Sequence, residues 1–296
     1  MPAARDTSHL ATASFARPPV APPHSPRIVV HGGDARARKF YPAGSVELVV
    51  TSPPYPMVAQ WDGLFAGLGA RSYEEMHHEL DRVWANCHRA LVPGGLLAVV
   101  VGDALRSIDG EFQLWPNHVT VTDACRRLGF RALPYVLWKK PTNRPNAFLG
   151  SGFLPPNAYV TLDCEFILLF RKGRLRRFPR HDTARAKSAF TRAERDRWFS
   201  QVWADVRGAR QGAPGRRSAA FPPAIPERLV RMFSVVGDTV LDPFAGTGTT
   251  LWAAYRAGRS AVGIELDPAS AGRLAVEARQ LTGPPEAIRE ARPRDG

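Results

Sequence analysis

The sequence predicts an α/β fold in which a mostly parallel sheet carries helices on both faces. Short apolar runs rich in Val, Ile and Leu alternate along the chain with amphipathic stretches, as in repeated strand–helix–strand units. A glycine-rich turn at Gly246 and Gly248 joins one apolar run to a helix-like stretch. The 296 residues are 44% hydrophobic and 23% charged, which is typical of a globular chain and excludes a fibrous or wholly disordered one.

The apolar runs and the amphipathic stretches place the elements along the chain. Strands are expected at residues 27–31, 46–51, 96–101, 131–138, 164–170, 239–242 and 260–265. Helices are expected at 72–91, 116–128, 225–235, 248–257 and 267–281. Pro93-Gly94-Gly95 closes the first of these helices. The two ends, 1–26 with six prolines and the charged, Pro-containing 283–296, are expected to be a disordered and a flexible tail.

The charge balance points to a polyanionic partner. Forty Lys and Arg against 27 Asp and Glu leave a net charge of +13, which favours nucleic acid over a membrane. Most of it lies in 171–217, where fifteen basic residues face only four acidic ones and no strand–helix alternation is expected. A GC-rich coding bias explains the many Arg residues equally well, and the basic run also fits a solvated face. Inside it, Thr191 and Glu194 predict a capping box, and three aromatic residues are expected in the local core: Trp198, Phe199 and Trp203.

The apolar runs and the cysteines exclude several classes of protein. No run approaches the roughly 20 residues that span a bilayer, and the N-terminal stretch lacks the apolar segment of a secretory signal. The three cysteines form no Cys-x-x-Cys pair, so neither a disulfide framework nor a metal site is expected. A reducing cytoplasm fits this usage. None of the three follows a proline, so the Pro-Cys nucleophile of ring-carbon cytosine methylation is absent.

The first chemical motif is the strand and turn Val240-Leu-Asp-Pro-Phe-Ala-Gly-Thr-Gly-Thr-Thr250. Its glycines let the backbone approach a ligand, and Glu265, about twenty residues on at the tip of the next strand, could grip a ribose diol. The motif lacks the third glycine of a dinucleotide fingerprint and the Gly-Lys-Ser/Thr of a phosphate-binding loop. This disfavours a nicotinamide dehydrogenase. Taken alone, the motif also fits a purely structural turn.

The second motif is Thr51-Ser52-Pro53-Pro54-Tyr55, which ends a buried strand. Two consecutive prolines fix the backbone and remove two amide donors, so carbonyl acceptors remain. Such a rigid acceptor cluster beside a Tyr ring suits a planar ring that carries an amino group. Taken alone, Pro-Pro-Tyr would fit an ordinary turn; the two motifs together favour a site.

Together, Thr-Ser-Pro-Pro-Tyr, Asp-Pro-Phe-Ala-Gly-Thr-Gly-Thr-Thr and Gly-Ile-Glu-Leu-Asp-Pro resemble the amino-methylating DNA methyltransferases that use S-adenosylmethionine. The catalytic motif precedes the cofactor motif, which is similar to the circularly permuted beta group. The resemblance covers roughly residues 27 to 281 and implies a Rossmann-like methyltransferase fold. It implies a catalytic half, 27–170, a basic target-recognition region inserted at 171–217, and a cofactor-binding half, 218–282.

The resemblance implies a role for each matching residue. The expected catalytic residues are Ser52, Pro53, Pro54 and Tyr55. The expected cofactor-binding residues are Asp34, Ala35, Thr51, Phe221, Pro222, Asp242, Pro243, Phe244, Ala245, Gly246, Thr247, Gly248, Thr249 and Glu265. The expected DNA-binding residues are Arg174, Arg176, Arg177, Arg180, Arg185, Lys187 and Arg192. Loops at 103–116 and 140–160 could also contact DNA. The residues Lys139, Lys140, Asn143 and Arg144 would lie at the ligand edge of the sheet. The family often has His where this chain has Arg217.

Ser before Pro-Pro-Tyr resembles the cytosine-N4 branch, as do Trp61-Asp62 and the stretch through Asn157 and Tyr159. The implied activity is site-specific methylation of the N4 amine of a flipped-out cytosine in duplex DNA, without metal or covalent intermediate. Adenine-N6 methylation remains an alternative, and a non-catalytic DNA-binding protein a more distant one. A cytoplasmic, nucleoid-associated enzyme is expected, as a monomer or homodimer, with a cognate restriction endonuclease left open. The sequence names no general base.

Overall fold

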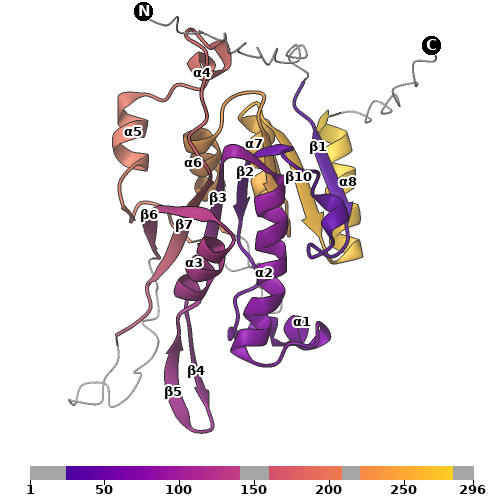
Figure 1. Ribbon diagram of the computed structural model, residues 1–296, viewed down its shortest axis with the longest axis vertical. Coiled ribbons are helices and arrows are strands. Elements are labelled where there is room, and N and C mark those ends of the chain that lie inside the picture. Colours follow the sequence, from indigo (N-terminus) through magenta and orange to yellow (C-terminus); the bar gives the residue numbers. More distant parts are fainter. Residues whose placement is uncertain (1–24, 141–159, 209–220, 283–296) are drawn as a thin grey trace, which may run out of the picture.

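The computed structural model describes residues 25–140, 160–208 and 221–282, and an eight-stranded sheet organises this part of the chain (Figure 1). Its strands are β1 Ile28–Gly32, β2 Val46–Thr51, β3 Leu91–Val101, β6 Phe130–Lys139, β7 Cys164–Lys172, β8 Val202–Trp203, β9 Thr239–Asp242 and β10 Ser260–Glu265. Their order across the sheet is β1-β10-β9-β2-β3-β7-β6-β8. β7 runs antiparallel to both of its neighbours, and the other neighbouring strands of this sheet are parallel. The predicted α/β class with a mostly parallel sheet is confirmed.

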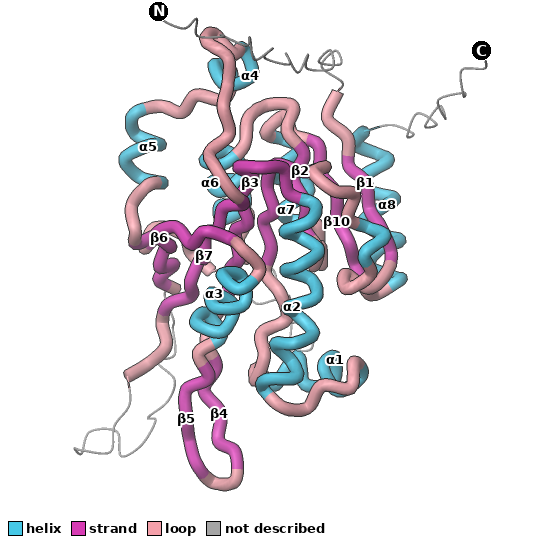
Figure 2. Tube along the Cα trace, viewed as in Figure 1, coloured by secondary structure: helices cyan, strands magenta, loops and turns pink. Residues whose placement is uncertain are grey.

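Helices cover both faces of the sheet (Figure 2). One face packs against α2 Tyr73–Ala90 and α3 Asn117–Arg127, and the other against α6 Ala224–Phe233, α7 Thr249–Arg256 and α8 Pro268–Thr282. The central strands alternate between the two cores: Leu48 and Val50 of β2 face α6 and α7, whereas Val49 faces α2. All three side chains are fully buried, which explains why such strands read as continuous apolar runs.

Local signals set the helix ends. Ser72 caps α2 in a capping box with Glu75, and Thr191 caps α5 (Arg192–Trp198) in the predicted box with Glu194. The strand expected at 96–101 begins earlier, at Leu91, directly after α2. Gly94 adopts φ +85° inside it, and a Cβ there would lie 2.5 Å from the backbone nitrogen of Arg176. A close backbone approach therefore explains this glycine.

Two expectations for the loops were wrong. The loop expected at 103–116 contains a hairpin of β4 (Ala104–Ile108) and β5 (Glu111–Trp115), which projects from the lower end of the molecule in Figure 1. Regular elements also occur in the described part of the basic run, 171–208, since α4 (Thr183–Lys187) and α5 lie there and β8 pairs parallel to β6 at the sheet edge. Short helices complete the described chain: η1 Arg38–Phe40, η2 Ala59–Trp61 and α1 Asp62–Gly67.

Further expectations concern the aromatic residues, the cysteines, membrane spans and the two tails. Trp198 and Trp203 are buried as expected, whereas Phe199 is 50% exposed. Cys87 and Cys125 are buried free thiols, and Cys164 is a partly buried one. No helix in the described residues is long and apolar enough to cross a membrane. The two tails, apart from residues 25 and 26, and the residues Asn143, Arg144, Asn157, Tyr159 and Arg217 lie outside the described ranges.

Candidate active site

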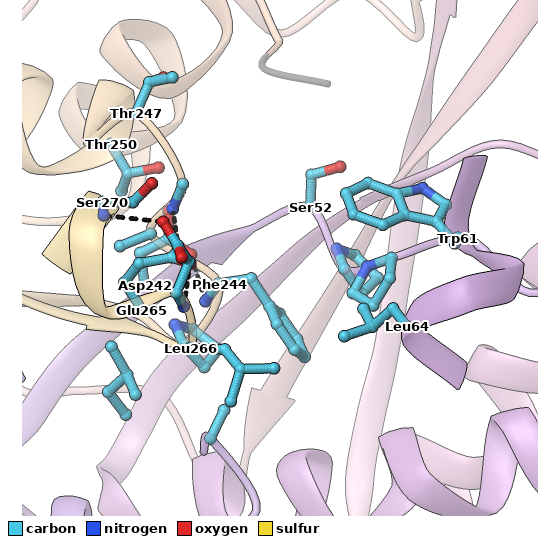
Figure 3. A pocket seen from close by; sticks show the side chains of 18 of the residues that line it. Ser52, Trp61, Leu64, Asp242, Phe244, Thr247, Thr250, Glu265, Leu266 and Ser270 are labelled. Carbon is cyan, nitrogen blue, oxygen red and sulfur yellow. Dashed lines mark hydrogen bonds between the residues drawn. The ribbon is translucent and has the colours of Figure 1, made fainter. Parts of the chain in front are cut away.

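A large cavity lies at the edge where the parallel strands end. Its volume is about 1970 Å³, and its lining comes from the segments that follow β1, β2, β9 and β10. Ligands of open α/β sheets bind at this carboxyl edge. Figure 3 shows Ser52, Trp61 and Leu64 on one side of the cavity, with Asp242, Phe244 and Glu265 facing them from the other. The cavity thus brings the two sequence motifs together across the sheet.

The glycine-rich turn between β9 and α7 needs its glycines. Gly246 and Gly248 adopt φ +52° and +77°, a region that favours glycine. A Cβ on Gly248 would lie 2.7 Å from Cδ2 of Leu274 and 2.8 Å from Nε1 of Trp252. On Gly246 it would meet nothing nearer than the Phe244 carbonyl oxygen at 3.8 Å. Gly248 therefore serves packing, and Gly246 leaves the backbone accessible from the cavity.

Asp242 links the two motifs. Its side chain is 2% exposed and accepts hydrogen bonds from Thr51 Oγ1 at 2.7 Å and from the Phe244 N–H at 3.0 Å. Burial raises the pKa of Asp242 to about 6, although these hydrogen bonds act in the opposite direction. Thr51 ends β2 and Asp242 ends β9, and the two strands are neighbours in the sheet. The carboxyl group thus links the end of β2 to the end of β9.

Glu265 presents its carboxylate at the end of β10. Its Oε2 accepts from the Gly246 N–H at 2.8 Å, and its Oε1 accepts from the Asp267 N–H at 2.9 Å. Two backbone donors therefore fix the side chain beside the glycine-rich turn. Pro243, Ala245, Thr247 and Thr249, all predicted for the cofactor site, line the same cavity.

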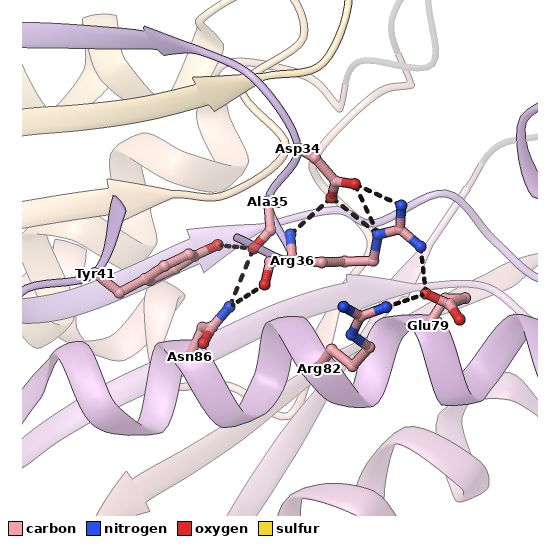
Figure 4. Close-up of polar contacts among 7 residues, drawn as sticks. All are labelled: Asp34, Ala35, Arg36, Tyr41, Glu79, Arg82 and Asn86. Atoms are coloured by element: carbon pink, nitrogen blue, oxygen red, sulfur yellow. Dashed lines mark hydrogen bonds and ion pairs between the residues drawn. The ribbon is translucent and has the colours of Figure 1, made fainter. Parts of the chain in front are cut away.

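Asp34 follows β1 and lies in an ionic cluster (Figure 4). The Arg36 guanidinium donates to Asp34, with Nε 2.8 Å from Oδ2, and also to Glu79 of α2. Hydrogen bonding from Arg36 lowers the pKa of Asp34. The Ala35 carbonyl accepts a hydrogen bond from the Tyr41 hydroxyl at 2.8 Å, which holds the loop after β1 in place. Arg36 lines the cavity beside the predicted residues Asp34 and Ala35, although no motif in the sequence pointed to it.

Ser52 and Tyr55 stand where β2 leaves the sheet. Pro53 and Pro54 are buried between them, so the segment is rigid. Ser52 Oγ donates to the Tyr55 hydroxyl at 3.1 Å, and that hydroxyl donates to Oε2 of Glu165 at 3.1 Å. Glu165 lies on β7 and lines the cavity, yet the sequence analysis did not single it out.

Phe221 and Pro222 enter the site from the segment before α6. Phe221 is 9% exposed and lines the cavity. The carbonyl of Pro222 accepts from the Ile225 N–H at 3.0 Å in the first turn of α6. The structure therefore brings all the predicted catalytic and cofactor residues to one edge. Within the described residues, no group of three or more His, Cys, Asp or Glu side chains is arranged to hold a metal ion.

The predicted DNA-binding residues lie elsewhere. Because β7 is antiparallel, Arg171 near its end pairs with Leu96 of β3, and the chain continues across the amino edge of the sheet. There Arg176 forms an ion pair with Asp238, just before β9, at 2.6 Å. The other predicted residues are exposed on this side: Arg174, Arg177, Arg180, Arg185, Lys187 and, on α5, Arg192. These residues therefore lie at the edge of the sheet opposite to Ser52, because β2 separates the two edges by about 20 Å. Their role in DNA binding stays a prediction.

Described basic residues also lie at the carboxyl edge. Lys139 ends β6 and is 57% exposed, at 3.9 Å from Asp163. Lys140 pairs with Glu165 and faces the cavity. Arg207, which follows β8, lines the cavity and is exposed. Among the described basic residues of 171–217, Arg207 lines the cavity.

Known proteins share this sequence and this arrangement. A family model described as DNA methylase, of the N6/N4 type, matches residues 46–273. The Type II methyltransferase M.MjaI of Methanocaldococcus jannaschii is 51% identical over 260 residues, which cover 79% of this chain and 86% of that protein. The Type II methyltransferase M.MthZI of Methanothermobacter thermautotrophicus is 47% identical over 242 residues, with 75% and 68% covered.

Solved structures agree with the sequence matches. A Thermus thermophilus protein described as a putative DNA modification methylase, complexed with S-adenosyl-L-methionine, superposes with a TM-score of 0.69 at 40% identity, covering 87% of this chain and 96% of that one. The cytosine-N4-specific PvuII DNA methyltransferase shares the fold, with a TM-score of 0.60 at 18% identity over 89% and 90% of the chains. This chain belongs to the N6/N4 family of S-adenosylmethionine-dependent DNA methyltransferases.

Proposed function

We propose that this enzyme transfers the methyl group of S-adenosylmethionine to the exocyclic N4 amine of a cytosine rotated out of duplex DNA, at specific sequences. The observation that carries this proposal is Ser52 at the cavity, next to two buried prolines and the ring of Tyr55. Ser in this position resembles the cytosine-N4 branch. The order of the motifs in the chain supports a place in the circularly permuted beta group.

The cavity offers groups suited to the cofactor. S-adenosylmethionine supplies a methyl group on a sulfonium, which leaves as a neutral thioether. Asp242 and Glu265 provide carboxyl groups, and Gly246 leaves the backbone open between them. We infer that Glu265 holds the ribose hydroxyls, that the turn from Asp242 to Thr249 holds the methionine end, and that Asp34 lies at the adenine edge.

The catalytic segment compensates for a weak nucleophile. The lone pair of an exocyclic amine is delocalised into the ring, so the amine must be held with that pair directed at the methyl group. Ser52 Oγ and the Pro53 carbonyl oxygen would accept the two N–H groups of the amine, while Tyr55 stacks on the ring. These acceptors favour a tetrahedral nitrogen aligned for transfer.

DNA must approach the carboxyl edge of the sheet. Rotating a base out of the stack costs about a few kcal/mol, and only a base from a duplex beside this edge reaches Ser52. Lys139 and Arg207 are exposed there and provide phosphate contacts. Since M.MjaI is named a Type II methyltransferase, we further propose a cognate restriction endonuclease as partner and a nucleoid-associated, cytoplasmic location. Monomer and homodimer both remain compatible with the proposal.

Analysis of the methylated base tests the proposal. The protein is incubated with duplex DNA and S-adenosylmethionine labelled in its methyl group, and the nucleosides are separated. Label is expected in N4-methylcytosine and absent from N6-methyladenine. Label in N6-methyladenine would refute the cytosine assignment, and sequencing the modified DNA identifies the site.

A matched pair of variants tests the role of Ser52. Ser52→Ala should lower the rate of methyl transfer by about 10²- to 10³-fold, the cost of one well-placed hydrogen-bonding group in an active site. Binding of S-adenosylmethionine and of the duplex should persist. Ser107→Ala, on the exposed part of β4, serves as the control and should keep the full rate. Full activity of Ser52→Ala would remove this residue from the mechanism.

A further inference from the structure

A chain of hydrogen bonds leads from the catalytic serine to a charged pair. Ser52 Oγ donates to the Tyr55 hydroxyl and that hydroxyl donates to Oε2 of Glu165, each over 3.1 Å. Oε1 of Glu165 accepts from the ammonium group of Lys140. The four residues come from three places in the chain: the segment after β2, the start of β7 and the end of β6. The sheet alone brings them together.

The chemistry of these groups gives the chain one direction. An ionised carboxylate only accepts hydrogen bonds, so the Tyr55 hydroxyl must be the donor in its hydrogen bond to Glu165. The lone pairs of that hydroxyl then accept the proton of Ser52. Ser52 Oγ is thereby left with lone pairs, and no proton, to offer toward the cavity.

The surroundings hold this arrangement in place. Glu165 is 9% exposed, and its ion pair with Lys140 stabilises the acceptor form. Lys140 also lies over the ring of Trp138, 4.9 Å from its centroid. A Cβ on Gly102 would lie 3.1 Å from the Tyr55 ring and 3.2 Å from Cγ of Glu165, so both side chains pack tightly on that glycine. Burial, together with the charge of Glu165, raises the pKa of Tyr55 well above its usual range, which keeps the hydroxyl protonated.

We propose that Glu165 is a positioning residue: acting through the Tyr55 hydroxyl, it makes Ser52 a hydrogen-bond acceptor for the target amine. This inference rests on the proposed function. A serine that donated instead would occupy the nitrogen lone pair that must attack the methyl group. No proton moves along the chain in this role, since only the orientation of two hydroxyl groups is fixed.

The test measures single-turnover methyl transfer in Glu165→Gln, in Tyr55→Phe and in the double variant. The Gln amide can donate as well as accept, so the chain loses its direction, and the Phe ring keeps the stacking surface without the hydroxyl. Each single variant should transfer methyl groups about 10- to 100-fold more slowly. This loss of rate is smaller than the loss expected when a group that contacts the substrate directly is removed. Dissociation constants for S-adenosylmethionine and DNA should change less than about twofold. Because both changes break the same chain, the double variant should be no slower than the slower single one.

Controls separate this role from a structural one. Lys140→Met keeps Glu165 but removes its ion pair, and it should slow methyl transfer by a smaller factor than Glu165→Gln does. The effects of Lys140→Met and Glu165→Gln should not be additive. This variant keeps the test decisive if Glu165→Gln lowers the melting temperature. Asp123→Asn, on the exposed side of α3, should match the parent enzyme.

Several outcomes would overturn the inference. Unchanged transfer in Glu165→Gln would do so, as would losses that multiply in the double variant or losses confined to substrate affinity. The same reaction mixtures report the methylated base. If label appears in N6-methyladenine while the rates remain coupled, the cytosine assignment fails and the positioning role of Glu165 stands.

Discussion

At the scale of single residues, Asp242 has the charge state most sensitive to its surroundings. Burial raises its pKa to about 6, whereas the carboxyl group in an unfolded chain titrates near 3.8. For this group alone, the folded state therefore binds more protons than the unfolded state between about pH 4 and pH 6, and the free energy of unfolding falls as pH rises through that window. A cationic ligand reverses the preference, because it favours the ionised carboxylate.

Binding of S-adenosylmethionine should therefore depend on pH through Asp242. About a tenth of the molecules carry an ionised Asp242 at pH 5 and about nine tenths at pH 7. The dissociation constant of S-adenosylmethionine should therefore be about tenfold larger at pH 5. Isothermal titration calorimetry at several pH values measures this. Asp242→Asn should bind weakly at every pH, and Asp123→Asn, on the exposed side of α3, should behave as the parent. A flat profile in the parent enzyme would contradict the prediction.

At the scale of elements, the turn between β9 and α7 shows how packing can require a glycine. Gly248 combines φ +77° with a Cβ position only 2.7 Å from Leu274 of α8. An alanine there would both strain the backbone and push on a core side chain of the neighbouring helix. The turn is thus tied to α8 as well as to the cavity.

Two glycine substitutions separate these effects. Gly248→Ala should lower the free energy of unfolding by about 2 to 3 kcal/mol, the sum of a left-handed alanine and local overpacking. Gly272→Ala, in the helical interior of α8 with nothing within 4 Å of its added Cβ, should instead raise it by up to about 1 kcal/mol. Urea denaturation monitored by circular dichroism gives both values. Equal stability of the two variants would show that the turn relaxes without cost.

Elements with strong periodicity could be predicted from the sequence, and elements without it could not. β2, β9 and β10 begin and end where their buried apolar runs do. The β4–β5 hairpin has only Asp109-Gly110 as a turn signal, and its strands expose Ile108 and Leu114 instead of facing a core. β8 has two residues, too few for any pattern.

The direction of the antiparallel strand β7 explains why Glu165 was not predicted at the cavity and why the basic residues that follow β7 lie away from it. Ser52, Asp242 and Glu265 could be predicted because they follow strands that end at the cavity. Glu165 stands at the beginning of β7, which the reversed direction brings to the same edge. The basic residues after β7 are carried to the opposite edge for the same reason. Strand direction depends on pairing between distant segments, which periodicity within one segment does not contain.

At the scale of the whole molecule, exposed basic residues lie at both edges of the sheet. Arg174, Arg177, Arg180 and Arg185 are exposed at the amino edge, whereas Lys139 and Arg207 lie at the edge of the cavity. A distance of about 20 Å between the edges exceeds the Debye length of about 8 Å at physiological salt. The amino-edge charges are therefore screened from a duplex that delivers its base to Ser52.

Salt dependence of DNA binding distinguishes the two edges. Each phosphate contact contributes about 0.9 to the slope of log K against log salt, so the double variant Lys139→Ala/Arg207→Ala should reduce the slope by about 1.8. The quadruple variant Arg174→Ala/Arg177→Ala/Arg180→Ala/Arg185→Ala should leave the slope and the methylation rate at limiting DNA nearly unchanged. Fluorescence anisotropy of a labelled duplex measures both variants. If the duplex contacted the amino edge instead, the quadruple variant would lose a slope of about 3.6 and the double variant almost none. The cofactor affinity of both variants should equal that of the parent, because none of the six side chains belongs to the cofactor turn.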